Sequence, residues 1–222
     1  MELNLRFCSS LVKVMPEEEP IAIKYESASV LLGETFSFQL VYYTDISCYD
    51  LNWNALNIEV ISKLKDNIII RSVELVPIDF MPEAVDADIV GEKLGLYPDL
   101  LKKIKGNSFV PVYKQWRALW ITVFVPFDLT PGKYSIKFRM AAHKQKTNTA
   151  EQIDFISNAF ILEVIGIKLP EQKLINTHWF HCDCLATYYK TEIFSDEHWR
   201  IIENFVKNAV AHGMNMLLTP LF

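Results

Sequence analysis

The chain has 222 residues, of which 50% are hydrophobic and 13% aromatic, so it can bury a sizeable core in one large or two modest domains. Its formal net charge of -5 and the absence of any basic run argue against a nucleic-acid-binding protein. No apolar segment of the sequence is long enough to span a bilayer, so we predict no membrane partner.

The N-terminal segment, residues 1–15, carries a charged side chain every few positions. It lacks the basic start and the unbroken apolar core of a signal peptide. The cysteines, at positions 8, 48, 182 and 184, suggest no disulfide framework, which favours a reducing compartment. We therefore expect a cytoplasmic protein; an export signal hidden by a misassigned start codon is the alternative.

Residues 1–168 are predicted to form an antiparallel β-sandwich. An opening strand is expected at Leu11–Met15, and Gly33 separates the next two strands. The strand over residues 34–43 alternates, so that Phe36, Phe38, Leu40 and Tyr42 share one face. Further strands are predicted at residues 56–62, 67–77, 115–126, 134–140 and 153–167. Strands of this length, joined by turns, are typical of a sandwich.

Residues 78–110 interrupt the strand pattern. Residues 81–88 are acidic and irregular, and Leu96–Leu101 is expected to form a turn or a short helix. Long connections of this kind are usually functional or pack across a domain face. Four aromatic residues cluster around it, and core or interface packing is the favoured role, with stacking on sugar rings as the alternative: Tyr97, Tyr113, Trp116 and Trp120.

Residues 169–222 are predicted to form a parallel strand–helix–strand unit, as at the start of a TIM-type barrel. The first strand is expected within residues 174–186, and Met214–Phe222 has the short apolar composition of a strand buried on both faces. Between them, Ser195 is a good N-cap for a helix, and Gly213 fits the left-handed position beyond the helix end.

A single unit of this kind leaves apolar faces and strand edges open. We therefore expect the remainder of a barrel, or a partner subunit, to cover it. If the apolar face of the helix is buried, Trp199→Ala is predicted to cost ~3–5 kcal/mol of stability.

Several short segments resemble, in their order, the N-terminal part of a known family. They are Gly33–Gln39, Gly95–Leu101, Leu119–Pro126 with Pro131–Tyr134, Leu169–Pro170, Thr177–Asp183, Glu197–Trp199 and Gly213–Pro220. The family is the glycoside hydrolase-like proteins of the domain of unknown function 4091 group, which is related to glycoside hydrolase family 123.

The resemblance implies a β-sandwich followed by a TIM-type barrel. It also implies that an Asp-Glu pair on a later barrel strand carries the chemistry, with the acetamido group of the substrate as nucleophile. The sequence ends at the second expected barrel strand, so no catalytic residue is assigned, and the chain alone is expected to be inactive. Asp196 and Glu197 are adjacent, but they open the predicted helix, where carboxylates compensate the dipole.

His181 and Asp183 are expected to share one face at the carboxyl end of the first barrel strand, where active sites of such barrels are built. Together with Trp179 they are the candidate substrate-binding residues. The alternative is a polar pair that completes a structural hydrogen-bond network.

His178, Cys182 and Cys184 are expected on the opposite face of the same strand. Catalytic zinc needs three convergent ligands, and structural zinc usually takes pairs of ligands from two separate loops. Small buried thiols packed under a helix explain the pattern equally well, and we predict no metal and no cofactor.

The predicted function is that of the accessory β-sandwich and barrel start of a glycoside hydrolase-like protein. Two alternatives stay open: a sandwich that binds carbohydrate through surface aromatic residues, and a packing domain without a ligand. Heat on titration with sugars is expected only for the carbohydrate-binding module.

Overall fold

The computed structural model describes residues 2–21, 24–45, 51–80, 93–146 and 149–219. The chain divides into two compact units, unit 1 (Met1–Leu169) and unit 2 (Pro170–Phe222). The acidic segment at residues 81–88 lies outside the described residues. In the part of the chain that is described, no helix is both long and apolar enough to cross a membrane.

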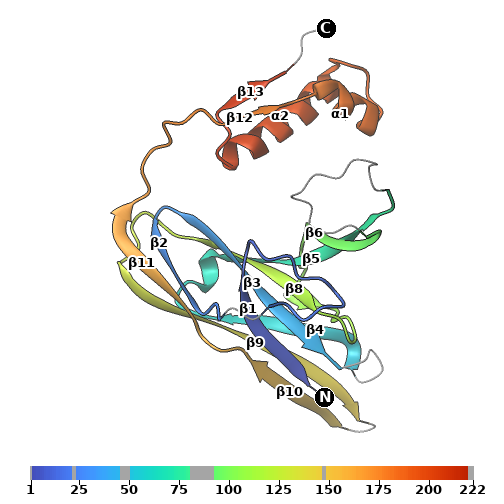
Figure 1. Ribbon diagram of the computed structural model, residues 1–222, viewed down its shortest axis with the longest axis vertical. Coiled ribbons are helices and arrows are strands. Elements are labelled where there is room, and N and C mark those ends of the chain that lie inside the picture. The colour runs from blue at the N-terminus through green and yellow to red at the C-terminus, as the bar shows by residue number, and fades with distance from the viewer. Residues whose placement is uncertain (1, 22–23, 46–50, 81–92, 147–148, 220–222) are drawn as a thin grey trace. The chain divides into compact units, whose positions relative to one another are not determined.

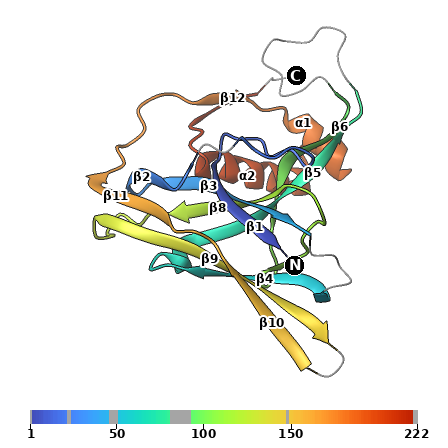
Figure 2. The ribbon, with the colours of Figure 1, turned by 60° about the horizontal axis from the view of Figure 1, so that its bottom comes forward.

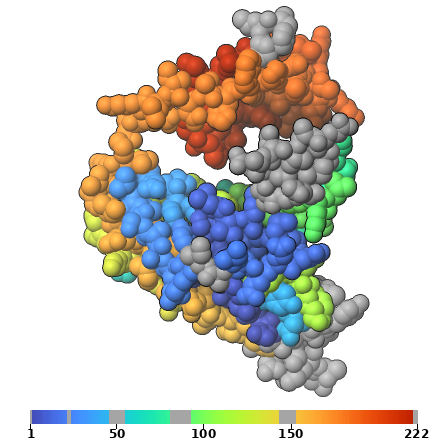
Figure 3. Space-filling view, in the orientation of Figure 1, coloured from blue at the N-terminus to red at the C-terminus, as the bar shows by residue number. Residues whose placement is uncertain are grey.

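One sheet of unit 1 is antiparallel throughout and has the strand order β1-β3-β8-β5-β6 (Figure 1). Its strands are β1 (Leu3–Ser9), β3 (Thr35–Thr44), β8 (Arg117–Phe124), β5 (Ile68–Ile78) and β6 (Gly95–Lys103). The predicted central position of the strand around residues 117–124 is confirmed, because β8 pairs with β3 on one side and β5 on the other. Figure 3 shows the N-terminal strands, in blue, covering one face of the unit.

The second sheet is mixed and has the order β2-β11-β9-β4-β7, with β10 also paired to β9. Its strands are β2 (Ser27–Leu32), β11 (Phe160–Lys168), β9 (Gly132–Lys146), β4 (Leu51–Ile61), β7 (Ser108–Phe109) and β10 (Thr149–Ile156). A short 3-10 helix, η1 (Lys65–Asn67), precedes β5. The β2–β11 pair is parallel, so the sandwich is not purely antiparallel as predicted. Figure 2 shows the β9–β10 hairpin projecting beyond the other strands.

The core lies between the two sheets and follows the alternation of the sequence. Phe38, Leu40 and Tyr42 of β3 all lie in it, as their period of two predicts. The opposing sheet contributes Phe138 and Phe160, and the rings of Phe38 and Phe160 stack at 4.2 Å. Burial of large aromatic side chains on this scale supplies much of the driving force for folding.

A second, smaller core lies on the outer face of the β1-β3-β8-β5-β6 sheet. It contains Val14, Val41 and Trp116, and it is covered by residues 10–18, which we call the N-terminal strap. The side-chain amide of Gln39 holds the strap by donating to the carbonyls of Ser9 and Val12, at 2.9 and 2.7 Å. The predicted strand at Leu11–Met15 is therefore wrong: the opening strand is β1, and these residues form the covering strap instead.

The predicted turn or helix at Leu96–Leu101 is also wrong, because these residues belong to β6. Pro98 is tolerated because β6 is an edge strand, and its pairing with β5 shifts register between Glu74 and Leu75. In the sequence, Pro98 within an apolar run indicates a turn. The segment forms a strand because it pairs with β5.

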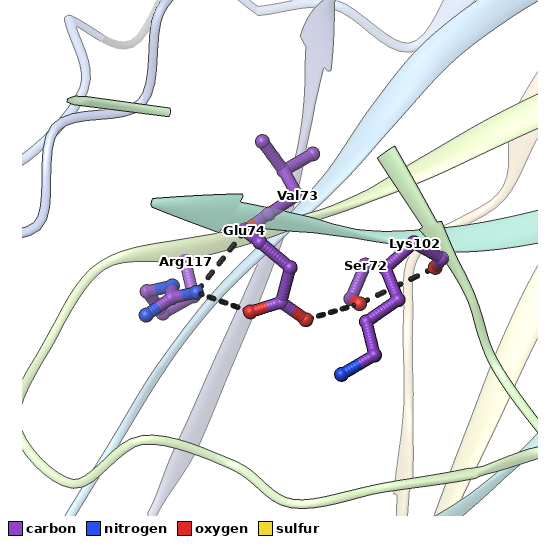
Figure 4. Close-up of polar contacts among 5 residues, drawn as sticks. All are labelled: Ser72, Val73, Glu74, Lys102 and Arg117. Atoms are coloured by element: carbon purple, nitrogen blue, oxygen red, sulfur yellow. Dashed lines mark hydrogen bonds and ion pairs between the residues drawn. The ribbon is translucent and has the colours of Figure 1, made fainter. Parts of the chain in front are cut away.

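Polar side chains tie β8, β5 and β6 together (Figure 4). Arg117 donates to the carbonyl of Val73 at 3.1 Å and lies 3.6 Å from the carboxylate of Glu74. The hydroxyl of Ser72 lies 2.6 Å from that same carboxylate and 3.3 Å from the carbonyl oxygen of Lys102. These contacts fix the edge strand β6 on the sheet.

The buried phenol of Tyr42 makes unit 1 sensitive to alkaline pH. Burial raises the pKa of Tyr42 to about 12, although the positive charge of Arg117 lowers it. The folded state favours the neutral phenol, so this contribution to stability is complete below the unfolded pKa of about 10 and is lost as pH rises through 12. We expect the free energy of unfolding to fall by about 2–3 kcal/mol across this range, measured in urea. A Tyr42→Phe variant should lack this part of the loss; an identical pH profile would contradict the argument.

Unit 2 contains β12 (Thr177–Trp179), α1 (Cys182–Tyr189), α2 (Asp196–Ala211) and β13 (Met216–Leu218). The predicted parallel pairing is confirmed, since Thr177 pairs with Met216 and Trp179 with Leu218. That this unit begins a barrel remains a prediction. The strand expected over residues 174–186 is far shorter, because α1 starts at Cys182.

The predicted helix is confirmed together with its ends. The Ser195 side chain accepts a hydrogen bond from the His198 backbone N–H at 3.3 Å, which caps the helix. Gly213 has a φ of +83°, and Met214 N–H bonds back to the Ala209 carbonyl at 3.1 Å. The chain therefore leaves α2 in a defined direction towards β13.

The apolar face of α2 is only partly covered within unit 2. Ile202 is buried, but Trp199 is 54% and Val210 62% exposed. The condition for the larger cost of Trp199→Ala, burial of this ring, is therefore not met. We now expect Trp199→Ala to cost less than about 1 kcal/mol of unfolding free energy in denaturant; a loss of about 3 kcal/mol or more would show that the ring is buried after all.

Candidate functional site

The two ends of the β12–β13 pair differ in chemistry, and the amino-terminal end is closed by amide side chains. Asn215 accepts from the Asn176 backbone N–H at 2.8 Å and donates to the Leu174 carbonyl at 3.0 Å. Gln172 and Asn176 both donate to the Gly213 carbonyl, at 2.9 and 3.2 Å. In parallel α/β barrels this end contributes to stability rather than to chemistry.

The carboxyl end of β12 carries the candidate functional site. Trp179 is 69% exposed, and its ring lies 6.0 Å from that of His181 at an interplanar angle of 26°. Two stacked, exposed rings form a flat platform with an apolar face and polar N–H edges. Such a surface can receive the C–H face of a sugar ring, while the imidazole provides a hydrogen-bonding nitrogen.

Asp183 is placed differently from the expectation. It does not share a strand face with His181, because His181 is the N-cap residue of α1 and Asp183 lies in its first turn. A carboxylate there stabilises the positive end of the helix dipole. Among the described contacts, no hydrogen bond joins the two side chains, so the predicted His–Asp pair is not formed.

The residues considered for zinc are also separated by the start of α1. Cys182 and Cys184 lie in the helix, whereas His178 lies on β12, so the predicted alternation on one strand face is wrong. Within the described ranges, no group of three His, Cys, Asp or Glu side chains is arranged to hold a metal ion.

The layer between the β12–β13 pair and α2 is incompletely filled. A cleft of about 400 Å³ lies there, lined by His178, Phe180 and Leu217 from the strand segments and by Phe205 and Val206 from α2. Its lining is mostly apolar, and the titratable side chains among the lining residues are His178 and His212. The cleft is therefore better described as an open part of a core than as a catalytic pocket.

His198 is the important residue of unit 2 that the sequence did not indicate. It is fully buried; its Nδ1 accepts from the Phe194 backbone N–H at 2.9 Å, and its Nε2 lies 2.7 Å from the carbonyl of Cys182. Because Nδ1 accepts, the proton is on Nε2, which donates to that carbonyl. His198 thus joins α2 to the first turn of α1 and positions the residues next to the platform.

One family model matches part of the chain. The model of the glycoside hydrolase 123 catalytic domain matches residues 179–222, which run from the end of β12 through β13. A family 123 glycoside hydrolase from Clostridium perfringens, studied for glycolipid glycan hydrolysis, has a similar fold with a TM-score of 0.67 at 16% identity. The predicted resemblance to glycoside hydrolase family 123 is confirmed. The similarity to the clostridial enzyme covers 97% of this chain but only 38% of the enzyme.

Two further structures are much less similar. The major subunit of aggregative adherence fimbriae type I from Escherichia coli has a TM-score of 0.30 at 11% identity, covering 74% of this chain and 95% of the subunit. A protein of the domain of unknown function 4466 family from Parabacteroides merdae has a TM-score of 0.34 at 7% identity, and the similarity covers 72% of this chain and 44% of that protein. Neither likeness carries an argument about fold or function. No curated protein sequence matches the chain.

Proposed function

We propose that the chain is the accessory β-sandwich and the beginning of the catalytic barrel of a glycoside hydrolase-like protein. The observation that carries the proposal is the match of the family 123 catalytic-domain model to residues 179–222, which coincide with the parallel unit of β12, α1, α2 and β13. The order of strand, helices and parallel strand is the repeating element of a TIM-type barrel.

The uncovered surfaces of unit 2 support the proposal. Trp199 and Val210 of α2 are more than half exposed, and the layer between α2 and the strands contains an open, apolar cleft. In a complete barrel, neighbouring strands and helices fill these positions. The proposed partner of unit 2 is therefore the remainder of the barrel, supplied by further polypeptide or by a partner subunit.

The platform of Trp179 and His181 is the proposed sugar-binding part of this chain, with Asp183 beside it. It lies at the carboxyl end of a parallel strand, which is the end that carries active sites in TIM barrels. The ligand of this site is proposed to be carbohydrate, in keeping with the glycoside hydrolase resemblance.

The isolated chain is proposed to be inactive. Its Asp196–Glu197 pair lies in the first turn of α2 and is exposed, where the two carboxylates stabilise the positive end of the helix dipole. The resemblance assigns catalysis to an Asp-Glu pair on a later barrel strand.

Hydrolysis assays test the proposal directly. We expect the 222-residue chain to release no nitrophenol from a panel of nitrophenyl glycosides, and we expect a longer protein that carries the remainder of the barrel to release it. In the longer protein, Trp179→Ala should raise KM about tenfold. The matched control is Tyr188→Ala, an exposed aromatic residue on α1, which should change nothing. Turnover by the short chain, or equal KM values for the two variants, would contradict the proposal.

A further inference from the structure

A groove of unit 1 lies between the N-terminal strap and the edge strand β6. Two clefts, of about 240 and about 710 Å³, are lined by these same two segments. On the strap, residues 10–14 line the smaller cleft and residues 15–18 line the larger one. On the opposite wall, residues 98–101 of β6 line the smaller cleft, and residues 93–97, at and just before the start of β6, line the larger one. The clefts therefore follow one another along a single groove, which we call the strap groove.

Lys13, in the wall of the smaller cleft, connects the strap to β6. Its Nζ donates to the Pro98 carbonyl at 3.0 Å and lies 4.0 Å from the carboxylate of Asp99. These contacts attach the strap to β6. A ligand of several linked rings could extend from one cleft into the other.

Each cleft has an aromatic side chain in its wall. The smaller contains Trp120, whose indole N–H has no hydrogen-bond partner among the described residues. The larger contains Tyr97, whose hydroxyl donates to the Lys93 carbonyl at 2.6 Å, so that the orientation of the ring is fixed. Of the other two aromatic residues noted near this connection, Trp116 is buried under the strap and Tyr113 is exposed outside both clefts.

Hydrogen-bonding groups stand beside these rings. Asp99 borders the smaller cleft, and Glu17, Glu18 and Gln115 border the larger one. Neither Glu17 nor Glu18 has an ion-pair or hydrogen-bond partner in the described part of the chain. Carboxylates and amides can accept from or donate to adjacent hydroxyls, while aromatic faces pack on C–H groups. This combination of groups suits sugar rings better than it suits a purely apolar or an anionic ligand.

The size and rigidity of the groove agree with this chemistry. The smaller cleft lies below the roughly 300–1,000 Å³ of sites for drug-sized ligands, so it suits one sugar ring. The strap is held by Gln39 and Lys13, and β6 is held through Ser72. Because both walls are fixed in advance, little ordering is needed when a ligand binds.

We propose that the strap groove binds a neutral oligosaccharide, with one sugar ring against Trp120 and another against Tyr97. This site belongs to the β-sandwich and is separate from the platform at Trp179. It does not require the barrel to be complete, and the proposed function could fail without affecting it.

Titration calorimetry of the full 222-residue chain tests the proposal. The probes are tetrasaccharides of glucose, galactose, mannose and N-acetylglucosamine, with a proline-rich peptide as the competing class of ligand. We expect at least one tetrasaccharide to bind, with a Kd of about 0.1–1 mM. Tyr97→Ala should weaken that binding about tenfold, and Asp99→Asn about threefold.

The matched control is Tyr113→Ala, which removes an exposed aromatic ring outside the groove and should leave the Kd unchanged. Trp120→Ala should also weaken binding, but Trp120 packs against the smaller core, so Tyr97 and Asp99 carry the test. The titrations are repeated in a Trp179→Ala background, so that binding at the platform does not contribute to the heat. Absence of binding to every tetrasaccharide, equal binding by Tyr97→Ala and Tyr113→Ala, or binding of the peptide alone would overturn the proposal.

Discussion

Replacing Phe38 by alanine is expected to destabilise unit 1 by about 3–5 kcal/mol. The side chain is fully buried between the two sheets, and its ring stacks on Phe160 at 4.2 Å and meets the edge of Phe7 at 5.7 Å. Truncation leaves a cavity at the point where β1, β3 and β11 meet, and close-packed neighbours cannot fill it without strain. Urea unfolding followed by circular dichroism measures the loss.

The matched control is Phe124→Ala in the neighbouring strand β8. Phe124 is 41% exposed, so its truncation should cost less than about 1 kcal/mol. Losses of the same size in the two variants would mean that the core is not centred on the aromatic layer around Phe38.

His198→Ala is expected to destabilise unit 2 by about 2–4 kcal/mol. The substitution leaves the Phe194 N–H and the Cys182 carbonyl without their side-chain partner and opens a cavity between α1 and α2. Amide hydrogen exchange over residues 182–211 should become faster, because α1 loses its attachment to α2. Unit 1 should exchange at its original rate.

His212→Ala is the matched control on the same helix. His212, the C-cap residue of α2, is exposed, and its Nδ1 lies 2.7 Å from the Asn208 carbonyl oxygen. We expect a change within about 0.5 kcal/mol and unaltered exchange in α1. If the two variants behave alike, His198 is not the link between the helices.

Much of the sandwich could be predicted because its strands bury one face. The alternation in β3 and the β-branched composition of β5 indicate strands whichever partners they have. Ser195 and Gly213 likewise mark the ends of α2 through local hydrogen bonds and a backbone conformation that favours glycine. Signals of this kind are local, and they survive without knowledge of the fold.

The segments that were predicted wrongly depend on distant contacts. Residues 11–15 look like a strand, but Gln39 and the outer face of the sheet turn them into the strap. Pro98 suggests a turn, but β5 provides a partner for an edge strand. In both cases tertiary contacts override a short-range pattern.

The candidate site shows the same division between local and distant signals. The position of Trp179 near the end of a strand could be predicted, but its stacking on His181 could not, because α1 starts two residues after Phe180. The burial of His198 could not be predicted, because a histidine in the first turn of a helix is usually a surface residue. The only signal was its place three residues after the capping Ser195.

The parallel pairing of β2 with β11 has a consequence for synthesis of the protein. Ser27 lies beside Ile161, so a strand made near the beginning of translation must wait for one made near the end of unit 1. Contacts between such distant parts of a chain slow folding, and unpaired edges are exposed to aggregation in the meantime. The emerging chain can complete this sheet only after residues 160–168 have left the ribosome.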